Sequence, residues 1–171
     1  KKLGSVQNMC ECKCGHDCKK EFVTGVHVYN DNQDIDLPDY GTSGAACIDL
    51  RIAEDVHLEP GQQKTVGTGL FVEIPKNLSL QIYSRSGMCH KYGLIVNNAP
   101  AIIDEDYRGE VRLILFNSGS HPIDMHRMDR VAQAELVPVH RIDWIPVESK
   151  TDLDPTTRGE KGFGDGSEHK G

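Results

Sequence analysis

The sequence has few aromatic residues, no long apolar run and no excess of positive charge, and each absence excludes a class of protein. Aromatic residues make up 6% of the 171 residues and hydrophobic residues 37%. No apolar run approaches the roughly 20 residues of a membrane-spanning helix. The net charge of −7 argues against a nucleic-acid backbone or an anionic membrane as the main partner. A small polyphosphate stays compatible, because a few local arginines can bind it within an acidic protein.

The length is sufficient for one domain with its own core, whereas two domains would be cramped. The low apolar content indicates that part of the surface is covered in an oligomer. The first residues, KKLGSVQNMC, lack the apolar core of a signal peptide. We therefore expect a soluble intracellular protein of the cytoplasm or nucleus, of cellular or viral origin.

Thiols are concentrated near the start of the chain. Four of the six cysteines lie within nine residues, together with one histidine. The candidate zinc ligands are Cys10, Cys12, Cys14, His16 and Cys18. Thiolates and imidazoles bind Zn²⁺, but fingers and ribbons have a distant second pair of ligands. A zinc site, disulfides and a reduced flexible segment are three open alternatives.

Strand-like patterns recur along the chain, and helical periodicity is scarce. In LSLQIY (78–83) and VRLILF (111–116) apolar residues alternate with other residues, the period of a strand with one buried face. Strands are expected at 26–29, 47–52, 69–74, 78–83, 94–97, 111–116, 131–139 and 142–147, and one short helix at 86–93. Many short strands separated by turn signals predict an all-β sandwich, barrel or jelly roll.

Three parts of the chain are expected from these patterns. Residues 1–20 form a Cys-rich appendage, 21–147 the β core, and 148–171 a flexible C-terminal arm. The arm contains RGEKGFGDG (158–166), which is either a frayed end or a loop that folds over a ligand. It is not a Walker loop, because Lys-Ser/Thr is missing after the last glycine, and not a Rossmann fingerprint, because no strand precedes it and no helix follows.

Two other stretches carry candidate chemistry. In IIDEDYRGE (102–110), Asp104 follows two isoleucines and is expected at the wall of the core, where a carboxylate can deprotonate water. A solvated acidic turn is the alternative. In YSRSGMCHKYG (83–93), Arg85 and the helix start suit a phosphate. There the alternative is an ordinary helix with Ser86 as its N-cap.

Two strands hold single polar residues. Asp49 in GAACIDLR (44–51) lies among apolar residues, where an aspartate is more often structural. Gln133 in DRVAQAEL (129–136) needs a hydrogen-bond partner if it points inward.

Taken in order, these stretches resemble the five motifs of the trimeric dUTP pyrophosphatases, or dUTPases. GAACIDLR is similar to the first motif, SRSGMCHKYG to the second and AIIDEDYRGEVRLILFNSG to the third. DRVAQAELVPV is similar to the fourth, and RGEKGFGDG to the fifth. The resemblance extends from about Val26 to Gly166 and leaves out the Cys-rich start.

The resemblance implies a jelly-roll subunit and a homotrimer with three active sites at the subunit boundaries. It further implies Mg²⁺-dependent hydrolysis of dUTP to dUMP and pyrophosphate, by attack of water on the α-phosphate. This reaction limits uracil in DNA and supplies dUMP for thymidylate synthesis.

Carried over by position, the resemblance makes Asp104 the general base and places Tyr107 under the deoxyribose, where it leaves no room for a 2′-hydroxyl. Uracil would be bound by Asn98 and the main chain near Ile102, Ile103 and Arg112. The phosphates would be held from a neighbouring subunit by Arg85, Ser86, Gly87 and Gln133. The arm would contribute Arg158 at the γ-phosphate, and Phe163 over the base with Gly164 beside it. Asp49 would lie near the waters of Mg²⁺, as an outer-sphere contact.

The sequence departs from the family pattern at several positions. Asp165 and Gly166 replace the usual Ser/Thr pair after GFG, and an aspartate there repels the γ-phosphate. Cys47 stands where glycine is common.

Two rival interpretations have less support. A dCTP deaminase shares the fold, but Ser-Gly follows Arg85 in place of that family's pattern. A regulatory protein on a dUTPase shell is disfavoured because Asp104, Arg158 and Phe163 are all present.

Overall fold

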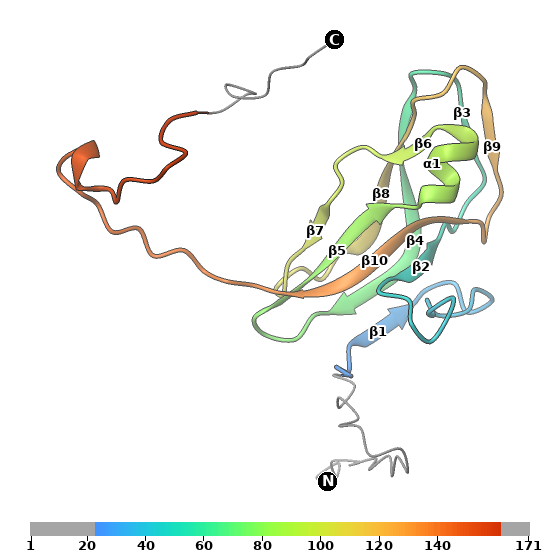
Figure 1. The fold of residues 1–171 in the computed structure, drawn as a ribbon. Coiled ribbons are helices and arrows are strands. Elements are labelled where there is room, and N and C mark those ends of the chain that lie inside the picture. Colours follow the sequence, from blue (N-terminus) through green and yellow to red (C-terminus); the bar gives the residue numbers. More distant parts are fainter. Residues whose placement is uncertain (1–22, 162–171) are drawn as a thin grey trace, which may run out of the picture. The chain divides into compact units, whose positions relative to one another are not determined.

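The computed structural model describes residues 23–161. The chain divides into a unit that ends at Val139 and a second unit that begins at His140, earlier than the start at 148 predicted for the C-terminal arm. Among the described residues, the first unit contains all the strands and one short helix (Figure 1). The predicted all-β fold class is therefore confirmed.

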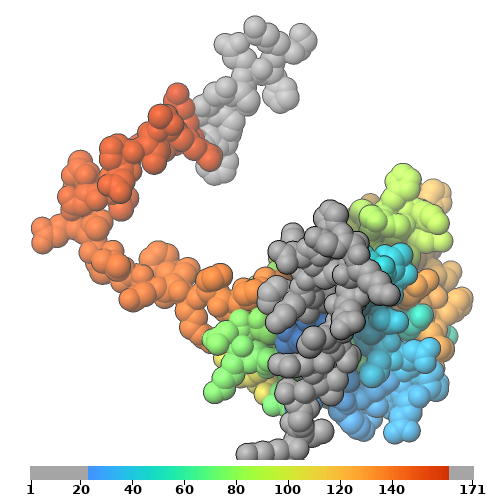
Figure 2. Space-filling model, turned by 60° about the horizontal axis from the view of Figure 1, so that its bottom comes forward, coloured from blue at the N-terminus to red at the C-terminus, as the bar shows by residue number. Residues whose placement is uncertain are grey.

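One sheet consists of four antiparallel strands in the order β1 (His27–Asn30), β4 (Gln63–Glu73), β8 (Glu110–Asn117) and β6 (Leu94–Val96). Strand β8 shows the alternation that the sequence predicts, with Val111, Leu113 and Leu115 fully buried. At the edge of the sheet, Val28 and Tyr29 of β1 are exposed. Figure 2 shows this edge and the loop that follows it (blue) at the molecular surface.

The second sheet has the order β2 (Ile48–Arg51), β10 (Arg130–Pro138), β5 (Leu78–Ser84) and β7 (Ala101–Ile103), again antiparallel. Ala134 of β10 lies opposite Ile82 of β5, and both are buried. Apolar residues of both sheets belong to one core cluster. Burial of these faces is the main force that holds the unit together.

A two-stranded ribbon, β3 (Val56–Leu58) with β9 (Ile123–Met125), adjoins this core. The first and last residues of each strand are buried, so His57 and Asp124 between them point outward. The only α-helix among the described residues, α1 (Ser86–Tyr92), follows β5 and ends at Gly93, which has a φ of 71°. No helix in the described part of the chain is long and apolar enough to cross a membrane.

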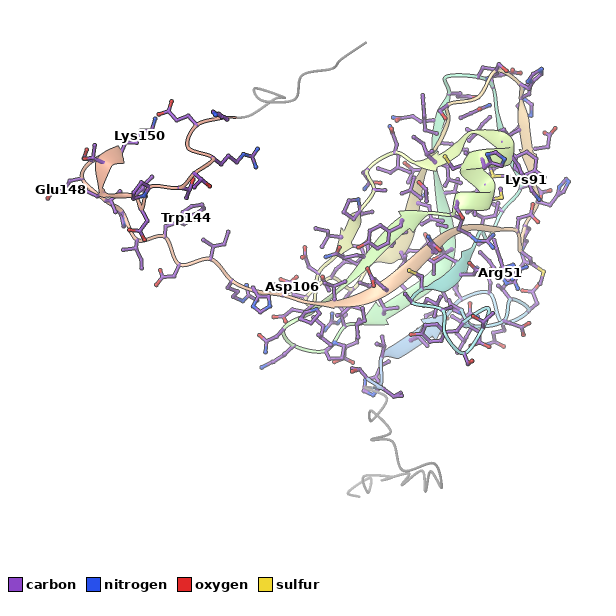
Figure 3. All side chains as sticks on the ribbon, in the orientation of Figure 1. Arg51, Lys91, Asp106, Trp144, Glu148 and Lys150 are labelled. Atoms are coloured by element: carbon purple, nitrogen blue, oxygen red, sulfur yellow. The ribbon has the colours of Figure 1, made fainter. Side chains whose placement is uncertain are left out.

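The strand predicted at 142–147 is wrong. These residues carry no regular secondary structure, and the second unit contains only a short 3₁₀ helix, η1 (Lys150–Asp152), among its described residues. Trp144 is 81% exposed and Ile145 84%, and Figure 3 shows Trp144 on an extended stretch of chain. An apolar run needs a pairing edge to become a strand, and within the described residues this run has none. Pro146 also lacks a ladder donor.

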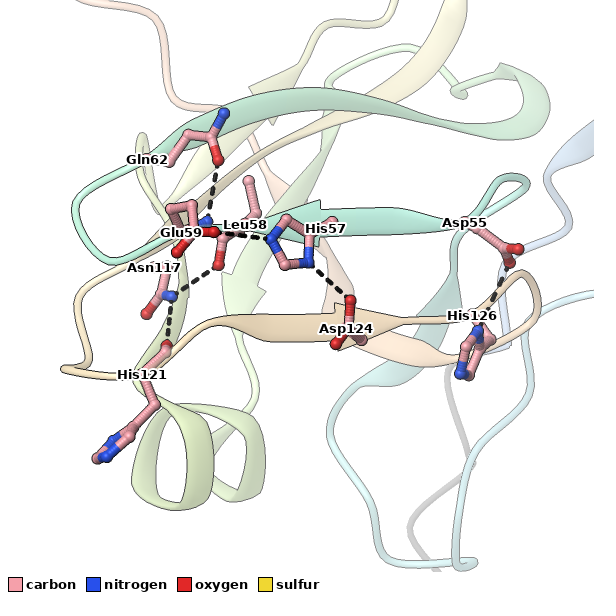
Figure 4. Close-up of polar contacts among 9 residues, drawn as sticks. All are labelled: Asp55, His57, Leu58, Glu59, Gln62, Asn117, His121, Asp124 and His126. Carbon is pink, nitrogen blue, oxygen red and sulfur yellow. Dashed lines mark hydrogen bonds and ion pairs between the residues drawn. The ribbon is translucent and has the colours of Figure 1, made fainter.

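The outer face of the ribbon carries a cluster of histidines and carboxylates (Figure 4). His57 contacts Asp124 through Nδ1 at 2.7 Å and Glu59 through Nε2 at 3.1 Å. His126 forms a longer ion pair with Asp55, at 3.9 Å. The hydrogen bond to Asp124, and then that to Glu59, raises the pKa of His57 above its usual value.

We expect stability to depend on pH through His57. Because its pKa is raised in the folded state, its contribution is fully present below the ordinary histidine pKa of about 6.5. That contribution is lost as pH rises through the higher, folded-state pKa. The measurement is the free energy of unfolding in urea between pH 5 and pH 9. His57→Gln should flatten the profile, whereas His121→Gln, whose ring contacts the Ser120 hydroxyl, should not; equal profiles for wild type and His57→Gln would contradict the prediction.

Candidate active site

Three of the predicted site residues meet where β2, β5 and β10 lie side by side. Asp49 on β2 is opposite Gln133 on β10, and Arg85 directly follows β5. The Asp49 carboxylate accepts from Arg85 Nε at 2.8 Å and from Arg130 Nη1 at 3.3 Å. Gln133 Nε2 donates to the carbonyl of Ser84 at 3.0 Å, so this half-buried amide has a hydrogen-bond partner although it lies between the core-facing Ala132 and Ala134.

Arg130 was not among the residues singled out from the sequence. It is the first residue of β10, and its carbonyl accepts from Arg85 Nη1 at 2.5 Å. Two guanidinium groups therefore share one carboxylate whose side chain is 19% exposed. The stretch DRVAQ contains no local signal for this role, because the aspartate that Arg130 contacts lies 81 residues away in the sequence, on β2. This arrangement leaves cationic donors beside the start of α1.

Ser86 and Gly87 are the first two helical residues of α1, and both are exposed. The alternative with Ser86 as N-cap is wrong. Arg85 is the N-cap residue, and no side chain caps the helix. A Cβ added at Gly87 would meet nothing within 4 Å, so the backbone there is open to an approaching group.

The turn after β7 carries Asp104 and Tyr107. The Tyr107 N–H donates to the carbonyl of Asp104 at 3.2 Å. Asp104 is exposed rather than set in the wall of the core, because the chain leaves the sheet after Ile103. Its carboxylate makes no hydrogen bond to any residue of the described range, and is therefore available to a water molecule.

The side chain of Arg108 stabilises this turn through hydrogen bonds to its main chain. Arg108 Nη1 donates at 2.8 Å to the carbonyls of both Glu105 and Tyr107. The Tyr107 hydroxyl donates to the carbonyl of Glu110 at 2.9 Å, and 41% of the Tyr107 residue is exposed. The turn thus presents a free carboxylate and one face of an aromatic ring.

The predicted uracil residues lie in the connection between β6 and β7, on β7 itself and on β8 after the turn. Asn98 is exposed in the connection between β6 and β7, and the preceding Asn97 N–H donates to the Ile114 carbonyl on β8 at 2.8 Å. Ile102 on β7 is 56% exposed, while Ile103 packs against the core. Arg112 on β8 forms an ion pair with Glu110, with 3.8 Å between Arg112 Nε and Glu110 Oε2. The exposed edge and turn here offer main-chain donors and acceptors.

Several predicted residues do not belong to the described part of the first unit. Arg158 belongs to the second unit, where its Nε donates to the Lys161 carbonyl at 2.9 Å. The following predicted site residues lie outside the described range: Phe163, Gly164 and the candidate zinc ligands Cys10, Cys12, Cys14, His16 and Cys18.

The donor groups of the described residues indicate which kind of metal site this chain offers. Residues 23–161 contain no group of three or more His, Cys, Asp or Glu side chains arranged to hold a metal ion. Asp49, the predicted outer-sphere contact, is already paired with two arginines. Mg²⁺ commonly keeps waters and binds through substrate phosphates rather than in an all-protein cage, and the residues present fit that mode.

Comparison with known proteins gives the family. The dUTPase family model matches residues 33–167. The deoxyuridine 5′-triphosphate nucleotidohydrolase of Zymomonas mobilis is 45% identical over 128 residues, which cover 75% of this chain and 86% of the relative. That of Chlamydia felis is 43% identical over 132 residues, covering 76% and 90%. The chain belongs to the dUTPase family.

Solved dUTPase structures have the same fold. The Staphylococcus bacteriophage 80alpha dUTPase with dUpNHpp aligns with a TM-score of 0.75 at 23% identity, over 85% of this chain and 99% of that one. A mutant dUTPase of phage phi11 of S. aureus, whose structure describes the coordination of a structural Mg(II) ion, aligns with a TM-score of 0.67 at 21% identity, over 74% and 99%. At these identities the likeness supports the fold.

We expect Asp49→Asn to destabilise the fold. The change removes the counter-charge of Arg85 and Arg130 at a carboxylate that is only 19% exposed. Loss of hydrogen bonds to charged groups should lower the free energy of unfolding by about 1–3 kcal/mol. Urea denaturation measures this, with Asp36→Asn, a change at an exposed aspartate, as the matched control. Equal stability of both variants would show that the pair contributes nothing.

Proposed function

We propose that the chain hydrolyses dUTP to dUMP and pyrophosphate, with water attacking the α-phosphate. Membership of the dUTPase family, with named relatives above 40% identity, supports this most directly. The reaction would limit uracil in DNA and supply dUMP for thymidylate synthesis, within the cell as the sequence predicts. One observation on residues supports the proposal further. The Asp104 carboxylate makes no hydrogen bond to another described residue, whereas Asp49 is paired with two arginines.

Asp104 is the proposed general base. Its exposed carboxylate follows β7 and makes no hydrogen bond to another residue of 23–161, so it can accept a proton from the attacking water. Tyr107 in the same turn is proposed to pack under the deoxyribose. Its place three residues after Asp104 keeps the sugar and the attacking water close together.

The connection around Asn98 together with β7 is the proposed uracil site. Uracil and cytosine differ in their donors and acceptors, and a mismatched base leaves buried polar groups unpaired. A site of this kind can discriminate by about 10⁴. The exposed Ile102 and the main chain of Ile103 lie on β7, and β8, the next strand in the sequence, carries Arg112.

The phosphates are proposed to lie at the start of α1. Arg85 supplies charge, Ser86 and Gly87 supply backbone N–H groups, and Gln133 holds the end of β5 in place through Ser84. Mg²⁺ bound to the phosphates would neutralise charge that otherwise repels the attacking water. Asp49 would contact that ion through water at most, because its carboxylate orients the two arginines.

A homotrimer is proposed from the distance between these groups. Strand β7 pairs Ile103 with Leu80 near the start of β5, whereas Arg85 follows its end. Arg85 lies five positions after Leu80, and five steps along an extended strand cover about 17 Å. One chain therefore holds its base and its phosphate arginine far apart, and a complete site requires Asp104 of one subunit and Arg85 of another.

The C-terminal residues are proposed to complete the site. Arg158 would reach the γ-phosphate and Phe163 would cover the base, with Gly164 beside it. The exposed side chains of Ile142, Trp144 and Ile145 are consistent with an arm that is covered by another copy. Zinc binding by the Cys-rich start remains a prediction from the sequence.

The proposed reaction predicts that the protein releases pyrophosphate from dUTP with Mg²⁺, and far less from dCTP or UTP. Asp104→Asn should keep nucleotide binding but lower kcat by at least ~10²-fold, the usual contribution of a positioned base. A colorimetric pyrophosphate assay measures turnover.

Asp106→Asn, in the same turn, is the matched control and should keep most of the activity. Near-normal turnover of Asp104→Asn would remove this residue from the mechanism. Release of ammonia from dCTP would favour the deaminase, and no turnover of any nucleotide would favour the regulatory alternative.

The shared site predicts a trimer, and light scattering should give three chain masses at micromolar concentration. Refolding Asp104→Asn and Arg85→Ala chains together should restore part of the activity that each has lost, because mixed trimers contain some sites with both native residues. A mixture that stays inactive, or a fully active monomer, would contradict the shared site.

A further inference from the structure

We propose that Gly109 fixes the position of the Tyr107 ring, and that it thereby determines the preference for deoxyribose over ribose. This inference rests on the proposed function, since it concerns the sugar subsite of the same reaction. Gly109 was not singled out in the sequence, where it appears only as the glycine before β8.

The ring of Tyr107 folds back over Gly109. Its hydroxyl donates to the carbonyl of Glu110 at 2.9 Å, so the side chain spans the two residues between them, Arg108 and Gly109. A Cβ added at Gly109 would lie 2.4 Å from Tyr107 Oη and 2.6 Å from Cζ. These distances are too short for any contact, and the ring has this place only because residue 109 lacks a side chain.

The backbone itself does not require glycine at 109. Its φ lies outside the left-handed range, and the three atoms nearest to an added Cβ all belong to the Tyr107 side chain. The conflict is with the far end of the Tyr107 side chain, which can turn away by giving up its hydrogen bond to Glu110. Alanine at 109 should therefore displace the ring rather than disrupt the strand.

The acceptor of the Tyr107 hydroxyl is held firmly from the other side. Glu110 begins β8, and its Oε1 accepts from the Gly69 N–H at 2.8 Å. A Cβ at Gly67 would lie 2.3 Å from the same oxygen, and Gly69 has a φ of 71°. These two glycines lie in β4 at the irregularity of its pairing with β8. The Glu110 main chain is thus anchored, and the hydroxyl bonded to it is anchored as well.

A ring held in this way can act as a steric gate. Apolar surfaces reject an added hydroxyl only weakly, by about 10², and a shift of about 1 Å in a positioning group can change rates by a similar factor. Exclusion of a 2′-hydroxyl therefore depends on a ring that does not move. Gly109 makes room for the ring, and the Glu110 carbonyl keeps it there.

The test is the ratio of kcat/KM for dUTP to that for UTP, with Mg²⁺. Gly109→Ala should lower this ratio about tenfold or more, through a higher KM for dUTP and a relative gain for UTP. Gly41→Ala is the matched control, because an added Cβ there meets nothing within 4 Å and its φ is not left-handed. That variant should keep the wild-type ratio.

A double-mutant cycle separates positioning from a structural effect. In a Tyr107→Ala background the ring is gone, so adding Gly109→Ala should leave the ratio unchanged. A folded Gly109→Ala variant with the wild-type ratio would overturn the proposal, as would an equal effect in both backgrounds.

If thermal unfolding shows that Gly109→Ala does not fold, Tyr107→Phe decides. This variant keeps the ring but loses the bond to the Glu110 carbonyl, and an unchanged ratio would overturn the proposal. Absence of dUTP hydrolysis by the wild type would instead refute the proposed function, so the two failures are distinguishable.

Discussion

Strand β5 is hydrogen-bonded along both sides, to β10 and to β7, and the placement of the candidate site depends on this double pairing. The pairing with β10 brings Gln133 and Asp49 next to the end of β5, where Arg85 leaves the sheet. The pairing with β7 places the Asp104 turn near its beginning. A strand is stiff, so the two groups lie apart within one chain. The proposed trimer would unite groups from different subunits.

Much of the fold was predictable because alternation reports burial directly. The runs at 78–83 and 111–116 became β5 and β8 almost residue for residue. The strands β3, β7 and β9 were missed, since three residues are too few to display a period. The run at 142–147 failed for the opposite reason. Its apolar residues do not pair with any strand among the described residues, and a local pattern contains no information about a distant partner.

The site shows the same division between local and distant information. The motif order identified the family, and Asp49, Arg85 and Gln133 do meet. Asp104 is exposed, as the alternative of a solvated turn has it, because two preceding isoleucines indicate burial only while the chain stays in the sheet. Arg130 and Gly109 were missed because their roles depend on partners that come into contact through folding: a carboxylate on β2 for Arg130, and a ring two residues away for Gly109.

Two aspartates of the site differ in their surroundings, and this difference supports the roles proposed for them. Asp49 is mostly buried and already shared between two guanidinium groups, so taking up a proton would cost it both ion pairs. Asp104 is exposed and its carboxylate makes no hydrogen bond to another described residue. A carboxylate accepts a proton from water most easily when no ion pair depends on its charge. Asp104 meets this condition and Asp49 does not, which favours Asp104 as the proposed base and Asp49 as the residue that orients the two arginines.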